Sequence, residues 1–332
     1  MGRYPLKKAI GEFVKARKAY YAPTSLTTTE SVLSTVEREY ADLRATNPEL
    51  EADPANWGER EVMTILLAMR QNGVARNTQL TRVSALKQLL RFVGNGAMDK
   101  MRAKSPQVFP RQETERKPSL DEDQLSKVLT ASDSIRGWRG ECIRFATWTY
   151  AYTGLRLNEL RMAEYADLDT KAWTLRVSHP KGERTYGTQR IVPIPEPLRS
   201  VITRFLSVRE RELARKGLFD TKPLVFAYNP KRPVTKQTVQ RWKVELEGMS
   251  GVEFTMHGLR RTYGQNLLNR GVALESVSLA LGHSSTLTTE KHYCRKNADS
   301  ARLEIVRAFE ESTPPSVNSP LIDRKKQLPG YA

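Results

Sequence analysis

Cysteine is scarce in this sequence of 332 residues, which contains only Cys142 and Cys294. Two isolated cysteines form neither a metal-ligand spacing nor a disulfide framework, so we expect a reducing compartment and no zinc site. Long apolar runs are also missing, since none reaches the ~18–20 residues of a membrane-spanning helix. The first residues, MGRYPLKKAIGEFVKARK, lack the apolar core of a signal peptide, and Gly2 lacks the downstream Ser or Thr of a myristoylation motif. These absences disfavour secreted, membrane-spanning and zinc-dependent proteins.

Negative charge is in short supply as well. The chain carries 37 Asp and Glu against 54 Lys and Arg, which gives a net charge of +17 and a pI near 9.9. Such a balance favours a polyanionic partner, of which nucleic acid is the leading candidate and an anionic membrane surface the alternative. Residues 1–118 hold 20 basic and 13 acidic residues, and residues 119–332 hold 34 and 24. Both stretches are therefore suited to contact the same polyanion, like the arms of a clamp.

Proline divides the chain at the polar segment PQVFPRQETERKP, residues 106–118. Proline lacks a backbone donor and disfavours helix in the residue before it, so this segment predicts an extended linker. The length also suits about two domains. We expect a helical domain over residues 1–105, a second domain over 119–311, and a disordered polar tail over 312–332.

Hydrophobic periodicity predicts mostly helices. Before the linker they cover Thr27–Arg44, Glu59–Gln71 and Thr78–Val93. Beyond the linker a helix begins after Ser119, its expected N-cap, and others cover Arg139–Thr153, Pro197–Lys216, Thr235–Glu247, Gly258–Asn269 and Leu274–Leu281. Strands are predicted over Ala172–Ser178, Gln189–Ile194 and, more briefly, Pro223–Ala227. The predicted fold class is therefore mainly α with a small β-sheet (α+β).

The stretch from Arg70 to Lys104 has eight basic residues and one acidic residue. Such a one-sided excess favours contact with phosphates, although a solvated helix face is the alternative. The candidate DNA-binding residues of this stretch are Arg76, Arg82, Lys87 and Arg91.

Two motifs beyond the linker place arginines at helix junctions. In TGLRLNEL, Gly154 marks a helix end and Arg156 follows it, where a planar guanidinium can hold two phosphate oxygens. In MHGLRRTYG, His257 and Arg260 are three residues apart at the start of a helix, so they share a face near its anion-favouring N-terminus. A surface arginine and a capping histidine are the alternatives.

Two further motifs supply a lysine, a histidine and a tyrosine. In HPKGERTYGTQRIVPIP, Lys181 enters a tight turn, from which it could protonate a leaving oxygen; an exposed hairpin lysine is the alternative. In LGHSSTLTTEKHY, Gly282 ends a helix, His283 follows it, and Tyr293 lies in the next short helix. A tyrosine can act as a nucleophile if nearby cations stabilise its phenolate, although most tyrosines are half-buried with a polar tip.

Together and in this order, the four motifs resemble the tyrosine recombinase, or phage integrase, family of site-specific DNA recombinases. The matching residues are Arg156, Lys181, His257, Arg260, His283 and Tyr293. The motif match spans about residues 119–311, and residues 1–118 match only in architecture. The resemblance implies an N-terminal helical clamp domain and a mixed helical catalytic domain of the DNA breaking-rejoining type.

The resemblance also implies a mechanism. Tyr293 attacks a DNA phosphate and forms a 3′-phosphotyrosyl link, while Arg156 and Arg260 hold the non-bridging oxygens. His257 and His283 hydrogen-bond the same phosphate, and Lys181 protonates the leaving 5′-oxygen. The phosphotyrosine keeps the bond energy, so we expect no cofactor and no metal ion, which agrees with the lack of a P-loop or a carboxylate cluster.

The partners expected from the resemblance are double-stranded DNA, three further copies of the chain in a homotetramer on two DNA sites, and accessory DNA-bending proteins. We expect no membrane association, and a location in the cytoplasm at the nucleoid, or in the host cytoplasm for a viral protein. The expected role is integration or excision of a viral or mobile element, with chromosome-dimer resolution as the alternative. A type IB topoisomerase and a catalytically silent DNA-binding protein are rivals from other classes. Tyr263 is the nearest competing tyrosine and suits the nucleophile poorly, because it lies within the HGLR helix.

Overall fold

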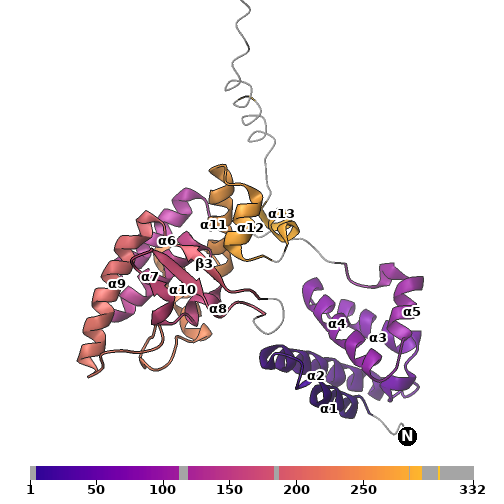
Figure 1. Cartoon of the computed structure of the whole chain (residues 1–332). Coiled ribbons are helices and arrows are strands. Elements are labelled where there is room, and N and C mark those ends of the chain that lie inside the picture. The colour runs from indigo at the N-terminus through magenta and orange to yellow at the C-terminus, as the bar shows by residue number, and fades with distance from the viewer. Residues whose placement is uncertain (1–4, 112–118, 183–186, 284, 294–305, 307–332) are drawn as a thin grey trace, which may run out of the picture. The chain divides into compact units, whose positions relative to one another are not determined.

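The computed structural model describes residues 5–111, 119–182, 187–283, 285–293 and 306, with the side chains at 288 and 291–293 excepted (Figure 1). The chain divides into two compact units, Met1–Arg116 and Lys117–Ala332. The predicted tail over residues 312–332 and Cys294 lie outside the described residues. No described helix is both long and apolar enough to cross a membrane.

The first unit is helical in all its described regular elements. These are α1 (Leu6–Arg17), α2 (Pro23–Thr46), α3 (Glu59–Gln71), α4 (Arg76–Phe92), α5 (Ala97–Lys104) and two short 3₁₀ helices, η1 (Pro54–Asn56) and η2 (Pro106–Val108). The core lies between α1, α2 and α4, where Phe13, Leu33 and Leu89 are completely or almost completely buried. On α4 the buried positions Val83, Leu86 and Leu90 recur at helical spacing, which explains why this segment packs as an amphipathic helix.

The linker prediction needs a correction at its start. Residues Pro106–Val108 form η2 rather than an extended chain, and Phe109 is only 3% exposed within the core of the first unit. Proline suits the first position of a helical turn because its fixed φ matches and its missing donor is not needed there. The Arg102 guanidinium also lies over the Phe109 ring, 4.8 Å from its centroid. Residues 106–109 therefore belong to the first unit, and residues 112–118 lie outside the described residues.

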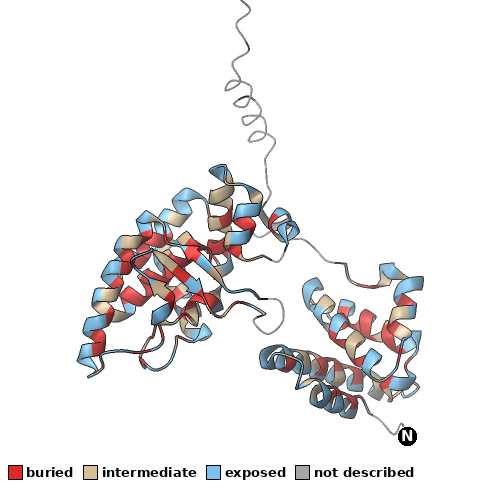
Figure 2. Cartoon of the chain, viewed as in Figure 1, coloured by how far each residue is buried: buried red, intermediate tan, exposed pale blue. Residues whose placement is uncertain are grey.

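The second unit surrounds one buried helix. Its helices are α6 (Glu122–Ser134), α7 (Gly137–Thr153), α8 (Leu157–Arg161), α9 (Glu196–Arg215), α10 (Lys236–Ser250), α11 (Met256–Asn269), α12 (Leu274–Leu281) and α13 (Thr286–Tyr293), with the 3₁₀ helix η3 (Tyr165–Asp167). Helix α7 is buried along most of its length, and α6, α9 and α11 pack against it. Figure 2 shows the buried residues concentrated along α7 and the faces turned toward it.

A small antiparallel sheet completes the second unit. Strands β1 (Leu168–Asp169), β2 (Thr174–Val177) and β3 (Arg190–Pro193) lie in the order β1-β2-β3. Leu175 pairs with Leu168 on one side and with Val192 on the other. Leu175, Val177 and Val192 are buried and alternate with more exposed neighbours, so one face of the sheet joins the core. The mainly helical fold with a small β-sheet is thus confirmed.

Two local predictions for the second unit are wrong. Asp121, not Ser119, caps α6: its side chain accepts a hydrogen bond from the Gln124 amide, and Gln124 reaches back to the Asp121 amide. The apolar run over Pro223–Ala227 is not a strand. Within it Pro223 forms an isolated bridge with Glu164, although Leu224, Val225 and Phe226 are buried. A short apolar run indicates that a segment is buried. To form a strand, the segment also needs a neighbouring strand whose backbone groups are free to pair with it.

Candidate active site

The first part of the candidate site is the C-terminal end of α7. Gly154 follows the helix in the left-handed conformation, with φ +61°, and a Cβ at this position would lie 2.3 Å from Tyr263 Cδ1. Only glycine meets both demands without strain. The chain then turns through Leu155 to Arg156, which stands at the N-terminus of α8.

Arg156 is held in place by the chain around it. Its Nη1 donates to Glu159 Oε1 at 2.8 Å, and its Nη2 donates to the Gly282 carbonyl at 2.9 Å. The Arg156 backbone N–H donates to Glu159 Oε2 at 2.8 Å, which closes a capping box at the start of α8. The Arg156 side chain keeps 24% of its surface exposed. It is therefore oriented by two acceptors and still reachable from solvent.

Arg260 is the second arginine of the candidate site and is buried, with 1% of its surface exposed. It lies on the first turns of α11, whose N-cap Thr255 accepts from the Gly258 amide. Its Nη1 donates to the Gly154 carbonyl at 2.6 Å, and its Nη2 donates to the Leu281 carbonyl at 2.5 Å. One guanidinium thus ties the end of α7 to the end of α12. These two backbone carbonyls orient the buried Arg260 guanidinium.

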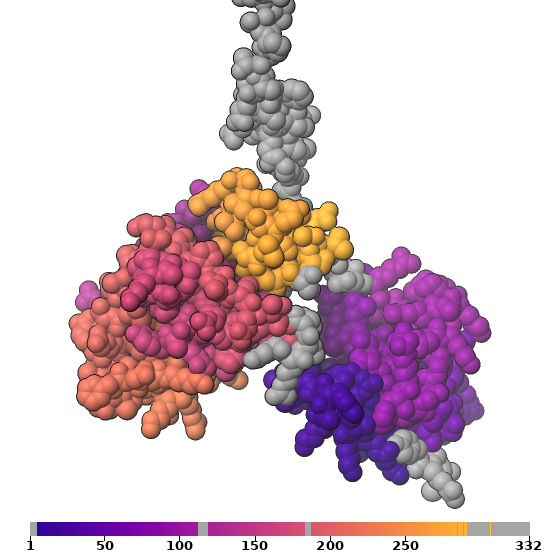
Figure 3. All heavy atoms as spheres, viewed as in Figure 1, coloured from indigo at the N-terminus to yellow at the C-terminus, as the bar shows by residue number. Residues whose placement is uncertain are grey.

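His283 joins this arginine to the last described helix. Helix α12 ends at Gly282, which is left-handed with φ +63°, and His283 comes next. His283 Nε2 lies 3.1 Å from Arg260 Nη2, and His283 Nδ1 lies 2.7 Å from Thr289 Oγ1 in α13. A guanidinium can only donate, so Nε2 is the acceptor and a neutral ring carries its proton on Nδ1. Helix α13 also packs against α11 and α12, and in the space-filling view these three helices, orange to yellow, gather in one region (Figure 3).

A buried carboxylate, that of Glu159, pairs with both Arg156 and Arg190. The Glu159 side chain is 1% exposed, and Arg190 at the start of β3 donates to both of its oxygens, at 3.1 and 2.9 Å. Burial raises the pKa of Glu159, but the hydrogen bonds and charge of Arg190 and the hydrogen bonds of Arg156 outweigh burial and lower this pKa to about 2. Glu159 is therefore an anion at neutral pH.

The structure brings together three of the six predicted catalytic residues, Arg156, Arg260 and His283. His257 is exposed at the second position of α11, and Lys181 is exposed in the turn after β2. Neither takes part in the hydrogen bonds given above. Tyr293 is the last residue of α13, and its side chain is outside the described residues.

Sequence reasoning missed Glu159, Arg190 and Thr289. A signal for Glu159 was present, since it follows Arg156 by three residues and can face it across one helical turn. Arg190 lies in the quoted hairpin motif, but its partners come from α8 and α12 and no local pattern indicates them. Thr289 suits a helix start, and nothing in its local sequence indicates a bond to His283.

The four predicted DNA-binding residues of the first unit lie on α4 and differ in their surroundings. Arg82 pairs with Glu39 at 2.8 Å, while Lys87 and Arg91 both pair with Asp99, at 2.6 and 2.7 Å. Hydrogen bonds from Arg91 and Lys87 lower the pKa of Asp99 to about 2. Arg76 is exposed and lines a hollow of about 290 Å³ with Arg70 and Arg111.

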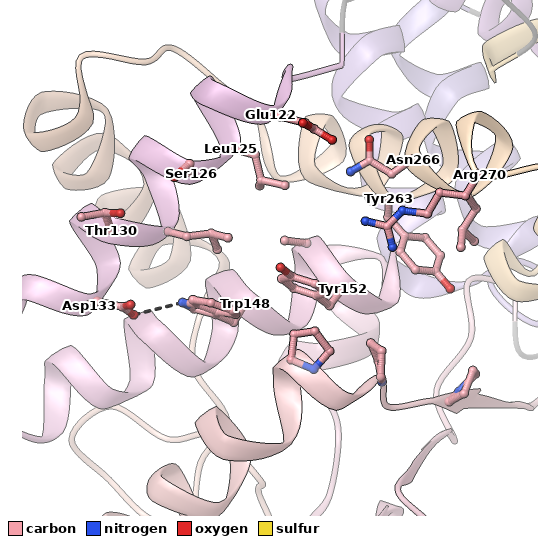
Figure 4. A pocket seen from close by; sticks show the side chains of 16 residues that line it. Glu122, Leu125, Ser126, Thr130, Asp133, Trp148, Tyr152, Tyr263, Asn266 and Arg270 are labelled. Carbon is pink, nitrogen blue, oxygen red and sulfur yellow. Dashed lines mark hydrogen bonds between the residues drawn. The ribbon is translucent and has the colours of Figure 1, made fainter.

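Arg156, Arg260 and His283 are called the cationic cluster below. A larger pocket of about 700 Å³ lies beside it, between α6, α7, α11 and the β3–α9 connection (Figure 4). Trp148 and Tyr152 stack in its wall, and the Trp148 indole donates to Asp133 at 3.0 Å. None of the six predicted catalytic residues is among the described residues that line this pocket. Tyr263 belongs to its wall and packs against Gly154, so it connects the pocket with the site.

Residues 118–300 match the family model described as "Phage integrase family". The chain belongs to this family of tyrosine recombinases. This recombinase is 30% identical over 250 residues to the tyrosine recombinase XerC of Bacillus pumilus. The alignment covers 73% of the chain and 79% of the relative. It is 28% identical over 256 residues to the tyrosine recombinase XerA of Pyrococcus furiosus, which covers 75% and 80%.

Solved structures share the fold of the recombinase. The XerH site-specific recombinase bound to difH substrate has a TM-score of 0.66 at 16% identity, with 92% of this chain and 98% of that chain covered. The Tn1549 transposon integrase in complex with transposon right end DNA has a TM-score of 0.66 at 18% identity, covering 92% and 99%. The predicted family is confirmed, and with it the class of DNA strand-transferring enzymes.

Proposed function

We propose that the chain is a site-specific recombinase that cuts and rejoins double-stranded DNA through a phosphotyrosyl intermediate, without a metal ion or other cofactor. The observation that carries this proposal is the convergence of Arg156, Arg260 and His283. Three separate segments deliver these side chains to one cluster, and backbone carbonyls fix the two guanidinium groups. Fixed donors of this kind stabilise the charge that grows on a phosphate in the transition state.

The position of Tyr293 on α13 supports the role proposed for it. Thr289 is fully buried and bonded to His283, and position 293 follows it by four residues on the same helix, hence on the same face. In the proposed reaction the Tyr293 phenolate oxygen forms a bond to phosphorus, and the bond from phosphorus to the 5′-oxygen breaks. The product is a 3′-phosphotyrosyl link and a 5′-hydroxyl, and attack by another 5′-hydroxyl reverses the step.

Two further residues supply proton transfers in this proposal. Lys181 gives a proton to the leaving 5′-oxygen, for which its exposed position at a hairpin turn and its flexible stem are suitable. His257 hydrogen-bonds the phosphate and helps to take the tyrosine proton. It stands one turn before Arg260 at the N-terminus of α11, where anions are favoured.

The first unit is proposed to hold the DNA duplex. Helices α2 and α4 present a groove lined largely by hydroxyl and amide side chains, which can bond to phosphates and base edges. Arg76, Arg82, Lys87 and Arg91 lie on the same helix α4 and are proposed to contact DNA, although Arg82 pairs with Glu39 and both Lys87 and Arg91 pair with Asp99. Of the four, Arg76 is the strongest phosphate candidate, because Arg70 and Arg111 line the same hollow.

A suicide DNA substrate, nicked so that the 5′-hydroxyl is lost after cleavage, tests the nucleophile. We expect the wild-type chain to form a covalent adduct and Tyr293→Phe to form none while still binding DNA. Tyr263→Phe is the matched control: burial raises the pKa of Tyr263, which makes it a poor nucleophile, so this variant should keep forming the adduct. An adduct that persists in Tyr293→Phe refutes the assignment.

The proposed biological role is integration or excision of a viral or mobile element, by a homotetramer on two DNA sites and with accessory DNA-bending proteins. Chromosome-dimer resolution is the second candidate. Solved neighbours include both a transposon integrase and Xer recombinases, so the shared fold favours neither role. Assays with paired sites on one or two plasmids separate integration from excision. Relaxation of supercoils without any exchange of partners would instead indicate a type IB topoisomerase.

A further inference from the structure

We propose that Arg190 is a positioning residue of this recombinase, which from strand β3 fixes both Arg156 and the Gly282–His283 turn. The proposal rests on the function proposed above. Arg190 lies outside the six predicted catalytic residues, yet it contacts the segments that carry two of them. Its side chain is 12% exposed, so its guanidinium belongs to the interior of the site rather than to its surface.

Glu159 is the first group that Arg190 holds. Its Oε1 accepts from Arg156 Nη1 and Arg190 Nη1, and its Oε2 accepts from the Arg156 amide and Arg190 Nη2. A carboxylate offers about four acceptor sites, so all are occupied. Without Arg190, Arg156 would be the one cationic partner left to the Glu159 carboxylate in the hydrogen bonds of the described residues. The two side chains would then tend toward a bidentate pair, which draws the Arg156 guanidinium away from a phosphate.

The turn after α12 is the second group that Arg190 holds. Arg190 Nε donates to the Ala280 carbonyl at 3.2 Å. The guanidinium also lies against Gly282, where a Cβ would be 2.8 Å from Arg190 Nη1. The carbonyl of Gly282 accepts from Arg156, and the next residue is His283. Arg190 therefore supports the backbone that aims both an acceptor for Arg156 and the histidine.

A simpler role for Arg190 would be to add one positive charge near the phosphate. Lysine separates the two roles, because it keeps the charge but cannot bridge two carboxylate oxygens with a planar fork. Arg204 provides a matched control in the same unit. It also donates to a buried carboxylate, Glu141, and neither residue contacts the cationic cluster in the hydrogen bonds of the described residues.

The experiment measures the single-turnover rate of adduct formation on the suicide substrate at saturating DNA, together with the Kd for uncleaved DNA. We expect Arg190→Ala and Arg190→Lys both to slow adduct formation by about 10- to 100-fold, as small misplacements of catalytic groups do, with Kd unchanged. Arg204→Ala should keep the wild-type rate per folded molecule. A wild-type rate in Arg190→Lys would show that Arg190 acts only through its charge and would overturn the proposal, as would a wild-type rate in both variants with only the Kd raised.

Amide hydrogen exchange tests the same proposal without reference to activity. The amides of Gly282 and His283 are bonded to the carbonyls of Leu279 and Ser278. In both Arg190 variants these amides should exchange at least several-fold faster than in the wild-type chain, and in Arg204→Ala they should not. If the wild-type chain forms no adduct, the proposed function fails, and the exchange rates alone then decide the role of Arg190. Unchanged exchange would overturn it.

Discussion

Two left-handed glycines give the candidate site its shape at the scale of single residues. Gly154 ends α7 and Gly282 ends α12, and the carbonyl of each accepts a hydrogen bond from a site arginine. Both positions are also crowded, by Tyr263 at Gly154 and by Arg190 at Gly282. The site therefore depends on backbone groups that a side chain would displace.

Gly154→Ala should lower the free energy of unfolding by about 2–4 kcal/mol, since it adds left-handed strain and an overpacked contact. Gly251→Ala is the matched control. Gly251 also ends a helix in the left-handed region, with φ +67°, but a Cβ there meets nothing within 4 Å. Its cost should stay near 1–2 kcal/mol, from strain alone. Urea denaturation of both variants measures the difference, and equal costs would contradict the crowding at Gly154.

Glu159 gives the site a defined response to acid. Its folded-state pKa of about 2 lies below the ordinary value of 4.5, so its ionised form stabilises the native state. That contribution is complete above about pH 4.5 and is lost as the pH falls toward 2. Glu159→Gln should cost about 3–5 kcal/mol at pH 7, because it leaves buried guanidinium groups without their anion. The difference in unfolding free energy between wild type and variant should shrink as acid protonates Glu159; a constant difference would contradict a charged Glu159.

At the scale of elements, the sequence predicted most of the helices but missed α1 and α5. Hydrophobic spacing and turn residues gave the observed bounds of α3 and α12, and the alternating segments around residues 172–194 became β2 and β3. These are local signals, set by the period of each element. The contacts that assemble the site are not local: Arg260 and Gly154 are 106 residues apart, and Arg190 and Glu159 are 31 apart. The order of the motifs predicts Arg156, Arg260 and His283 as site residues. Arg190 and Thr289 can be recognised beside them only from the packing of the folded chain.

Helix α13 is tied to the site by a side-chain hydrogen bond between His283 and Thr289. Thr289→Val keeps the shape of the side chain and removes the hydroxyl. The lost bond is worth about 1 kcal/mol, so adduct formation should slow about five-fold if the position of α13 limits the attack. Thr289→Ser keeps the hydroxyl and should stay near the wild-type rate. The suicide-substrate assay measures both variants, and equal rates would show that this bond does not position α13.

At the scale of the whole molecule, both units carry excess positive charge, but the cationic cluster lies within the second. Under the proposed function, this division predicts that DNA affinity and cleavage chemistry respond to different residues. In the first unit, Arg70, Arg76 and Arg111 line one hollow, and no carboxylate is among the described residues that line it. Three guanidinium groups around a hollow are suited to a backbone phosphate.

Replacement of Arg70, Arg76 and Arg111 by alanine should therefore weaken DNA binding and reduce its salt dependence. Each lost phosphate contact lowers the slope of log K against log salt concentration by about 0.9. Adduct formation at saturating DNA should keep its wild-type rate, because the cationic cluster is untouched. Arg60→Ala is the control: Arg60 is exposed in the same unit but pairs with Glu49 at 2.7 Å, so its removal should leave the slope unchanged. A triple variant that keeps the full slope would place the phosphate contacts of the first unit elsewhere, and a slower chemical step would show that the hollow also serves the catalytic unit.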